Sequence, residues 1–170
     1  DAGRPLPRVS LAFSGPEGPG TQTTDPDSGV VSFGQGAGPH TVRFSREGYL
    51  PVWRQETLVA DQTTVLANPR LTPRAERSVP VTPLGGAVIE DGSGSVRIEV
   101  GPGVVTQETA LTLTPLTSQN LPALVPRGWS PLRAFWLESP TAFLSPPNAW
   151  LRPEGPIESA ETAALVQWDE

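Results

Sequence analysis

The feature that most constrains the fold is an alternation of apolar and polar residues inside residues 84–116. In its middle, Val96, Ile98 and Val100 alternate with polar or charged residues. Such a period of two is typical of a β-strand that turns one side-chain face to a core and the other to water. The stretch therefore predicts a sheet, and it carries no catalytic or ligand-binding motif.

Glycine-rich turns bound this strand on both sides. Asp91-Gly92-Ser93-Gly94 tolerates the positive φ angles of a hairpin, and Gly101-Pro102-Gly103 cannot continue a ladder because proline has no N–H. A third segment follows, with leucines on one side and threonines on the other. We predict one three-stranded meander, with strands over residues 87–89, 96–100 and 110–116.

This order of strands and turns resembles the domain shared by zonula occludens proteins, ankyrins and netrin receptors, which also occurs in bacterial surface proteins. The resemblance covers roughly residues 79–170 and implies further strands within 130–140 and 143–151. Gly101-Pro102-Gly103-Val104 stands where the family usually has Pro-Pro-Gly-Ala. The segment 165–168 predicts a strand without its partner, so we expect a domain truncated at its C-terminus. The matching residues are Gly85, Gly86, Val88, Val96, Ile98, Val100, Pro102, Gly103, Leu111 and Leu113.

The first 73 residues predict a smaller all-β unit, because turn signals recur at short intervals. Val9, Leu11 and Phe13 alternate with small residues, and Asp25-Pro26-Asp27-Ser28-Gly29 predicts a turn. Strands are predicted around residues 9–13, 21–24, 30–33, 40–45, 52–59 and 63–66.

This unit resembles the carboxypeptidase regulatory-like domain, a transthyretin-like sandwich that serves as a non-catalytic module. The family normally begins with one more strand, which would be missing here or supplied from elsewhere. Residues 68–77 are rich in proline and charge, as linkers are. The resemblance is carried by Gly3, Pro5, Leu6, Val9, Leu11, Asp25, Gly29, Val31, Phe33, Gly38, His40, Val42, Phe44, Gly48 and Tyr49.

We therefore predict an all-β chain with two tandem β-sandwich domains. Residues 1–73 would form the carboxypeptidase regulatory-like (transthyretin-like or Ig-like) sandwich, 74–78 the linker, and 79–170 the zonula-occludens-type sandwich.

Composition narrows the classes of partner and chemistry. A net charge of −6 disfavours nucleic acid and anionic membrane surfaces. The absence of cysteine removes disulfides, thiolate nucleophiles and cysteine metal sites. We find no apolar run of about 18 residues and no signal peptide, and expect a fragment of a longer secreted or cell-surface bacterial protein.

His40 is the single histidine and the first candidate for catalysis. A Ser-His-Asp triad would need a serine and a carboxylate to converge on it, although it lies in a predicted strand. Some netrin-receptor-type relatives cleave themselves at His-Phe-Ser, which this chain lacks; its similar strand reads Ala134-Phe135-Trp136. We predict no enzyme activity and no cofactor.

Two acidic turns could offer oxygen ligands to calcium. Each offers at most three side chains, whereas calcium takes six to eight oxygens. Acidic residues also stabilise turns by themselves, so we favour that role and predict no metal. The two clusters are Asp25, Asp27 and Ser28, and Glu90, Asp91 and Ser93.

Tryptophans are the remaining candidates for a binding site, because an exposed indole can stack on a sugar ring. Trp129 lies on a predicted loop and is the first candidate; Trp53 is the second. The alternative for Trp129 is that it pins its loop over one end of the sandwich. Trp136, Trp150 and Trp168 are predicted to fill the core.

These patterns favour a non-catalytic structural or docking module pair in a large secreted or cell-surface bacterial protein. The pairing resembles regions of bacterial rearrangement-hot-spot (RHS) repeat proteins. Neighbouring domains of the same polypeptide or a protein partner would bind it, with no nucleic acid and no membrane insertion. A carbohydrate-binding or adhesive module that uses Trp129 and Trp53 is the alternative, and a self-processing domain ranks last.

Overall fold

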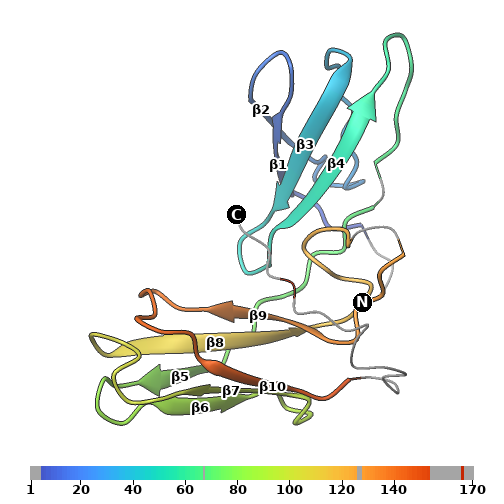
Figure 1. Ribbon diagram of the computed structural model, residues 1–170. Helices are drawn as coiled ribbons and strands as arrows, with labels where there is room; N and C mark the ends of the chain where they lie inside the picture. The colour runs from blue at the N-terminus through green and yellow to red at the C-terminus, as the bar shows by residue number, and fades with distance from the viewer. Residues whose placement is uncertain (1–4, 67, 126–127, 154–165, 167–170) are drawn as a thin grey trace. The chain divides into compact units, whose positions relative to one another are not determined.

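The computed structural model describes residues 5–66, 68–125, 128–153 and 166 (Figure 1). These residues form ten strands and no helix, so the predicted all-β class is confirmed. None of them forms a helix able to cross a membrane. The chain divides into two compact units: unit 1 is Asp1–Pro73 with Gln119–Pro126, and unit 2 is Arg74–Ser118 with Arg127–Glu170.

Unit 1 contains one antiparallel sheet with the strand order β2-β1-β3-β4. Leu11 and Phe13 are buried while their neighbours in β1 are exposed, as the alternation predicts. The third strand continues the same face with Val42 and Phe44. The strands are β1 (Ser10–Ser14), β2 (Gly20–Thr23), β3 (Gly38–Ser45) and β4 (Val52–Leu58).

Loops cover the buried face of this sheet. The strands predicted at 30–33 and 63–66 do not form, because neither segment pairs with a ladder. Their apolar side chains still pack on the core, among them Val31 and Phe33, and Phe33 stacks on Phe13 with ring centroids 4.8 Å apart. The alternation in these two segments correctly indicates that one side is buried, but neither segment has a neighbouring strand with which to form backbone hydrogen bonds.

The segment Gln119–Pro126 also belongs to unit 1, although it lies between β8 and β9 of unit 2 in the sequence. Trp53 N donates a hydrogen bond of 2.7 Å to Pro122 O. Arg54 Nη1 donates to Trp53 O at 2.7 Å and to Pro122 O at 3.5 Å. Leu121 and Pro122 are buried. No sequence pattern indicated that this segment docks beside β4.

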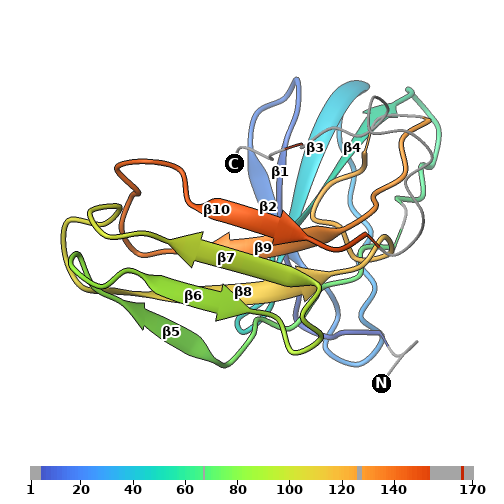
Figure 2. The same cartoon turned by 60° about the horizontal axis from the view of Figure 1, so that its bottom comes forward.

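Unit 2 contains two three-stranded antiparallel sheets, ordered β10-β7-β6 and β5-β8-β9 (Figure 2). The single meander was therefore a wrong prediction, because the third segment joins the other sheet. The chain stops pairing at Gly101, and the buried Val104 and Val105 carry it toward β8. The strands are β5 (Ser78–Val81), β6 (Ala87–Glu90), β7 (Val96–Val100), β8 (Thr109–Leu116), β9 (Ala134–Glu138) and β10 (Asn148–Leu151).

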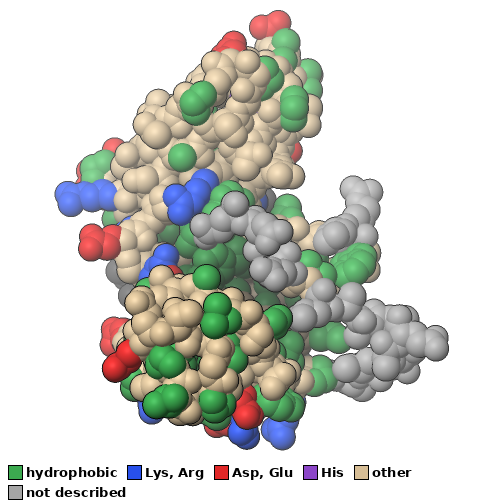
Figure 3. Space-filling view, turned by 60° about the vertical axis from the view of Figure 1, so that its left-hand side comes forward, with side chains coloured by type: hydrophobic (Ala, Val, Ile, Leu, Met, Phe, Trp, Pro, Cys, Tyr) green, Lys and Arg blue, Asp and Glu red, His purple; other side chains and the backbone are tan. Residues whose placement is uncertain are grey.

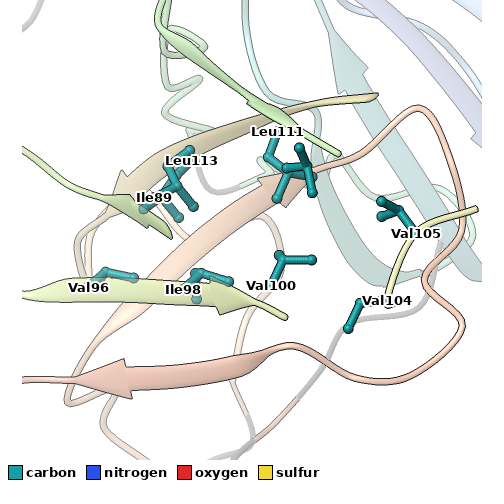
Figure 4. Close-up of a cluster of buried hydrophobic side chains, with 9 residues drawn as sticks. Ile89, Val96, Ile98, Val100, Val104, Val105, Leu111 and Leu113 are labelled. Atoms are coloured by element: carbon teal, nitrogen blue, oxygen red, sulfur yellow. The ribbon is translucent and has the colours of Figure 1, made fainter. Parts of the chain in front are cut away.

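One buried cluster joins the two sheets of unit 2 (Figure 4). Side chains from β6 and β7 meet those from β5 and β8. Burial of an aliphatic side chain of this size contributes about 1.5–3 kcal/mol, so this cluster is the main stabilising element of the unit. Its members are Val81, Ile89, Val96, Ile98, Val100, Val104, Val105, Leu111 and Leu113.

The backbone requires glycine at the second position of the Gly85-Gly86 pair before β6. Gly86 has φ 62, its N–H donates to Thr82 O at 2.9 Å, and a Cβ built on it would overlap Val100 O of the neighbouring strand. Only glycine avoids both the left-handed strain and this overlap.

Candidate functional site

His40 lies on the buried face of β3, where it is 4% exposed. Its Nε2 donates to Gly36 O at 2.8 Å, and the ring fills the space beside Gly15, where any Cβ would overlap it. No histidine is visible on the face drawn in Figure 3. The imidazole is therefore packed and hydrogen-bonded within the unit.

A hollow of about 670 Å³ opens beside this histidine. Ser14 and Thr41 pair in register and are not part of the buried face, whereas His40 alternates with Thr41 and points to the opposite side of the sheet. Serine and histidine are thus not brought together as a triad requires. The hollow is lined by Ser14, Gly15, Pro39, His40, Thr41, Gln55, Glu56 and Thr57.

Asp25 stabilises the predicted turn in unit 1. Its Oδ1 accepts hydrogen bonds from Asp27 N at 3.0 Å, Ser28 N at 2.7 Å and Ser28 Oγ at 2.9 Å. The hydrogen bond from the Ser28 backbone is the main cause that lowers the pKa of this carboxyl. The turn closes with a bond of 2.9 Å from Gly29 N to Asp25 O.

Asp91 has the same role in the β6–β7 hairpin of unit 2. Oδ1 accepts from Ser95 N at 2.7 Å and Val96 N at 3.0 Å, and Oδ2 accepts from Ser93 Oγ at 2.6 Å and Ser95 Oγ at 2.9 Å. Burial raises the pKa of this carboxyl, but the four hydrogen bonds outweigh it and lower the pKa to about 2. Within the part of the chain that the structure describes, no three His, Cys, Asp or Glu side chains gather as metal ligands would.

The two tryptophans predicted to bind ligands lie in different settings. Trp129 follows Gly128 in a loop of unit 2 and is 52% exposed. Trp53 is half-buried on β4 of unit 1, directly opposite Arg43 of β3. The Arg43 guanidinium carbon lies 5.6 Å from the Trp53 ring centroid, a cation–π distance.

Trp150 was predicted to fill the core, and the structure corrects this. The side chain is 50% exposed on β10, because Leu151 takes the core-facing position and alternation turns Trp150 outward. Trp136 is half-buried on β9, and Trp168 lies outside the described residues.

Trp150 also faces an arginine across the ladder. It pairs with Arg97 of β7, whose guanidinium carbon lies 5.5 Å from the ring centroid. Arg97 Nε lies 3.6 Å from Glu90 Oε1, and Arg97 Nη2 lies 3.8 Å from Glu99 Oε2. This outer face of the β6–β7–β10 sheet thus carries an aromatic ring, a cation and two carboxylates side by side. Sequence reasoning missed it because the pairing of β10 with β7 was unknown.

Comparison with known proteins gives no relative. A scan against protein-family models found no match, and searches of curated proteins and of solved structures also found none. The resemblances to the carboxypeptidase regulatory-like and zonula-occludens-type domains therefore stay predictions.

Proposed function

We propose that the chain is a pair of non-catalytic all-β modules, the first related to the carboxypeptidase regulatory-like domain and the second to the zonula-occludens-type domain. The described residues of the first module form one sheet covered by loops, so the second sheet of a sandwich would come from elsewhere. The pair would serve as a structural or docking unit in a large secreted or cell-surface bacterial protein of the RHS-repeat kind. Its partners would be neighbouring domains of the same polypeptide or another protein.

The observation that supports this role is the docking of Gln119–Pro126 in unit 1. The polypeptide crosses between the units after Pro73, after Ser118 and after Pro126. Unit 1 is therefore built from two separate parts of the chain. This arrangement suits a module that keeps neighbouring domains in place, because if one part comes loose from unit 1 the other part still belongs to it.

Single-molecule pulling of the full chain tests the proposal. We expect distinct rupture events, because both units are antiparallel sheets with buried cores. Leu121→Asp should lower the force at which unit 1 ruptures, since a charge replaces a side chain that is only 7% exposed.

The matched control is Leu124→Asp in the same segment, where the native leucine is 68% exposed and the rupture force should not change. Smooth extension without rupture would contradict the proposed structural role. If unit 1 ruptures at the same force in Leu121→Asp and in the native chain, the segment Gln119–Pro126 does not contribute to the mechanical stability of unit 1.

A second function, carbohydrate binding or adhesion, is favoured by the exposed Trp129 and Trp150 and the half-buried Trp53. Trp129 is open to solvent, and Trp53 and Trp150 each lie beside an arginine on a sheet surface. Binding of the full chain to an array of glycans tests this function. Loss of binding in Trp129→Ala or Trp53→Ala would place the contact at the residues that the sequence favours.

A further inference from the structure

We propose that the outer face of the β6–β7–β10 sheet binds a neutral sugar ring. The ring would stack on Trp150 and hydrogen-bond to Arg97, Glu99 and Asn148. This inference rests on the second proposed function, carbohydrate binding, and gives it a site on a residue that the sequence placed in the core.

The strand register arranges the site as two rows across three strands. Trp150 of β10 pairs with Arg97 of β7, which pairs with Glu90 of β6. In the second row Glu99 of β7 pairs with Asn148 of β10 and with Val88 of β6. Side chains paired within a row have Cβ atoms about 4.5–5.5 Å apart, and diagonal neighbours in the two rows are about 7–8 Å apart, which long and aromatic side chains can span.

The opposite side of the same strands fixes this face in place. Ile89, Val96, Ile98 and Val100 are buried, and Leu151 packs on their cluster. The outward-facing residues therefore belong to a sheet whose other face is packed against the core. A ligand-binding surface on strands loses less conformational freedom on binding than a loop does.

The Trp150 ring is open on part of its surface. Arg97 lies at cation–π distance from the ring, and half of the side chain remains accessible. We infer that the guanidinium covers one side and fixes the orientation of the indole, which leaves the other side for a ligand. An indole held in this way offers the flat apolar surface on which the C–H face of a sugar ring packs.

The charges of this face contribute little to the stability of the fold. The side chains of Arg97, Glu90 and Glu99 are 48%, 51% and 44% exposed, and ion pairs exposed to this extent are weak. Their arrangement does, however, present one donor group and two acceptor groups beside an aromatic ring. Sugar hydroxyls, which both donate and accept, match that set.

The same charges argue against cationic and anionic ligands, which can also bind beside a tryptophan ring. A cationic group on the open side of the ring would be repelled by the Arg97 guanidinium on the other side. An anionic ligand would meet Glu90 and Glu99 on a chain of net charge −6. A neutral polyhydroxylated ring avoids both conflicts.

The two tryptophans that the sequence favours as ligand-binding residues, Trp53 and Trp129, lack this combination. The cross-strand row of Trp53 continues from Arg43 to Ala12, so no carboxylate follows the arginine in that row. Trp129 lies on a loop, without a ladder partner. Both residues therefore serve as internal controls.

The test uses the full chain and a panel of soluble neutral oligosaccharides, namely glucans, mannans, xylans and galactans. Titration calorimetry gives the affinity, and the indole N–H signals in an NMR spectrum report which tryptophan is contacted. We expect at least one sugar to shift the Trp150 indole signal, which Trp150→Phe identifies by its absence. Trp150→Ala should weaken binding about tenfold or more, with Trp150→Phe between it and the native chain.

Arg97→Gln should weaken binding severalfold, because it removes the group that orients the ring. Trp53→Ala and Trp129→Ala should stay within about twofold of the native affinity, and near-ultraviolet circular dichroism checks that each variant is folded. If sugar binding persists in Trp150→Ala and is lost in Trp129→Ala or Trp53→Ala, the function stands and this site is wrong. If no sugar in the panel binds, both fail. A shift of the Trp150 signal only by choline, by a lysine-rich peptide or by raising the protein concentration would also overturn the proposal.

Discussion

The two units use the same sequence pattern and close their cores differently. In unit 1 one sheet buries Leu11 and Phe13 against loop side chains such as Phe33 and Leu71. In unit 2 two sheets bury a shared cluster that includes Ile98 and Leu111. The difference teaches that alternation specifies a buried side for each strand, whereas the layer that covers this side is chosen by tertiary packing.

Truncation of one core residue in each unit should give the largest effect. We expect Ile98→Ala to cost about 4 kcal/mol, because two sheets cannot easily close over the cavity. Leu11→Ala should cost about 2–3 kcal/mol, because loops can move into the space more readily than paired strands can. Hydrogen exchange resolved by residue measures each unit in the full chain. Equal costs would show that the loops of unit 1 are packed as rigidly as a sheet.

Glycine replacement compares the turns of the two units. Gly86→Ala in unit 2 should cost about 3 kcal/mol, because the new Cβ adds an overlap with Val100 O to the strain of a φ of 62. Gly48→Ala in unit 1 has a φ of 77 and open space, so it should cost only the left-handed strain of about 1–2 kcal/mol. Chemical denaturation measures both. If Gly86→Ala lowers the free energy of unfolding by clearly less than about 3 kcal/mol, β6 and β7 move apart easily to accommodate the new Cβ.

The acidic turns should differ in their dependence on pH. Asp91→Asn should cost up to about 2 kcal/mol at neutral pH, an upper value because the hairpin borders solvent. The folded pKa of Asp91 is lowered from 3.8 to about 2, so the advantage of the native carboxylate is present above pH 4 and lost as the pH falls toward 2.

Asp25→Asn in unit 1 is the matched control, since this turn is exposed and its loss should be smaller. Denaturation at pH 7, 4 and 2 measures both variants. A difference between native chain and Asp91→Asn that does not change with pH would contradict the lowered pKa.

The two arginine–tryptophan pairs should give the smallest effect. Double-mutant cycles of Arg97 with Trp150 and of Arg43 with Trp53 should each yield a coupling of about 0.5–1 kcal/mol, the range for exposed cation–π pairs. Added salt should also weaken the ion pairs of Arg97 with Glu90 and Glu99. A coupling of zero for Arg97 and Trp150 would mean that the arginine does not hold the ring.

Most strands could be predicted from the sequence, because a buried side appears locally as every second apolar residue. Ser10–Ser14, Gly38–Ser45 and Val96–Val100 lie where that pattern indicates. The strand expected at 30–33 does not form, because an alternating pattern does not indicate whether a neighbouring strand is available for pairing.

The sequence could have predicted part of the candidate site around Trp150. Asn148, Trp150 and Arg152 alternate with Ala149 and Leu151, which could have indicated that Trp150 points outward. The neighbours of the ring could not be found in this way, because Arg97 and Trp150 are far apart in the sequence and meet only through the register of β7 and β10.

The sequence by itself determined the all-β class, the turns at Asp25 and Asp91, and the buried side of most strands, because these depend on side chains within a few residues of one another. Tertiary structure alone decided that β8 leaves the sheet of β7, that Gln119–Pro126 docks in unit 1, and that Trp150 stands beside Arg97. Those outcomes depend on which distant strands exchange backbone hydrogen bonds, and every residue except proline offers the same N–H and C=O groups whatever its side chain is.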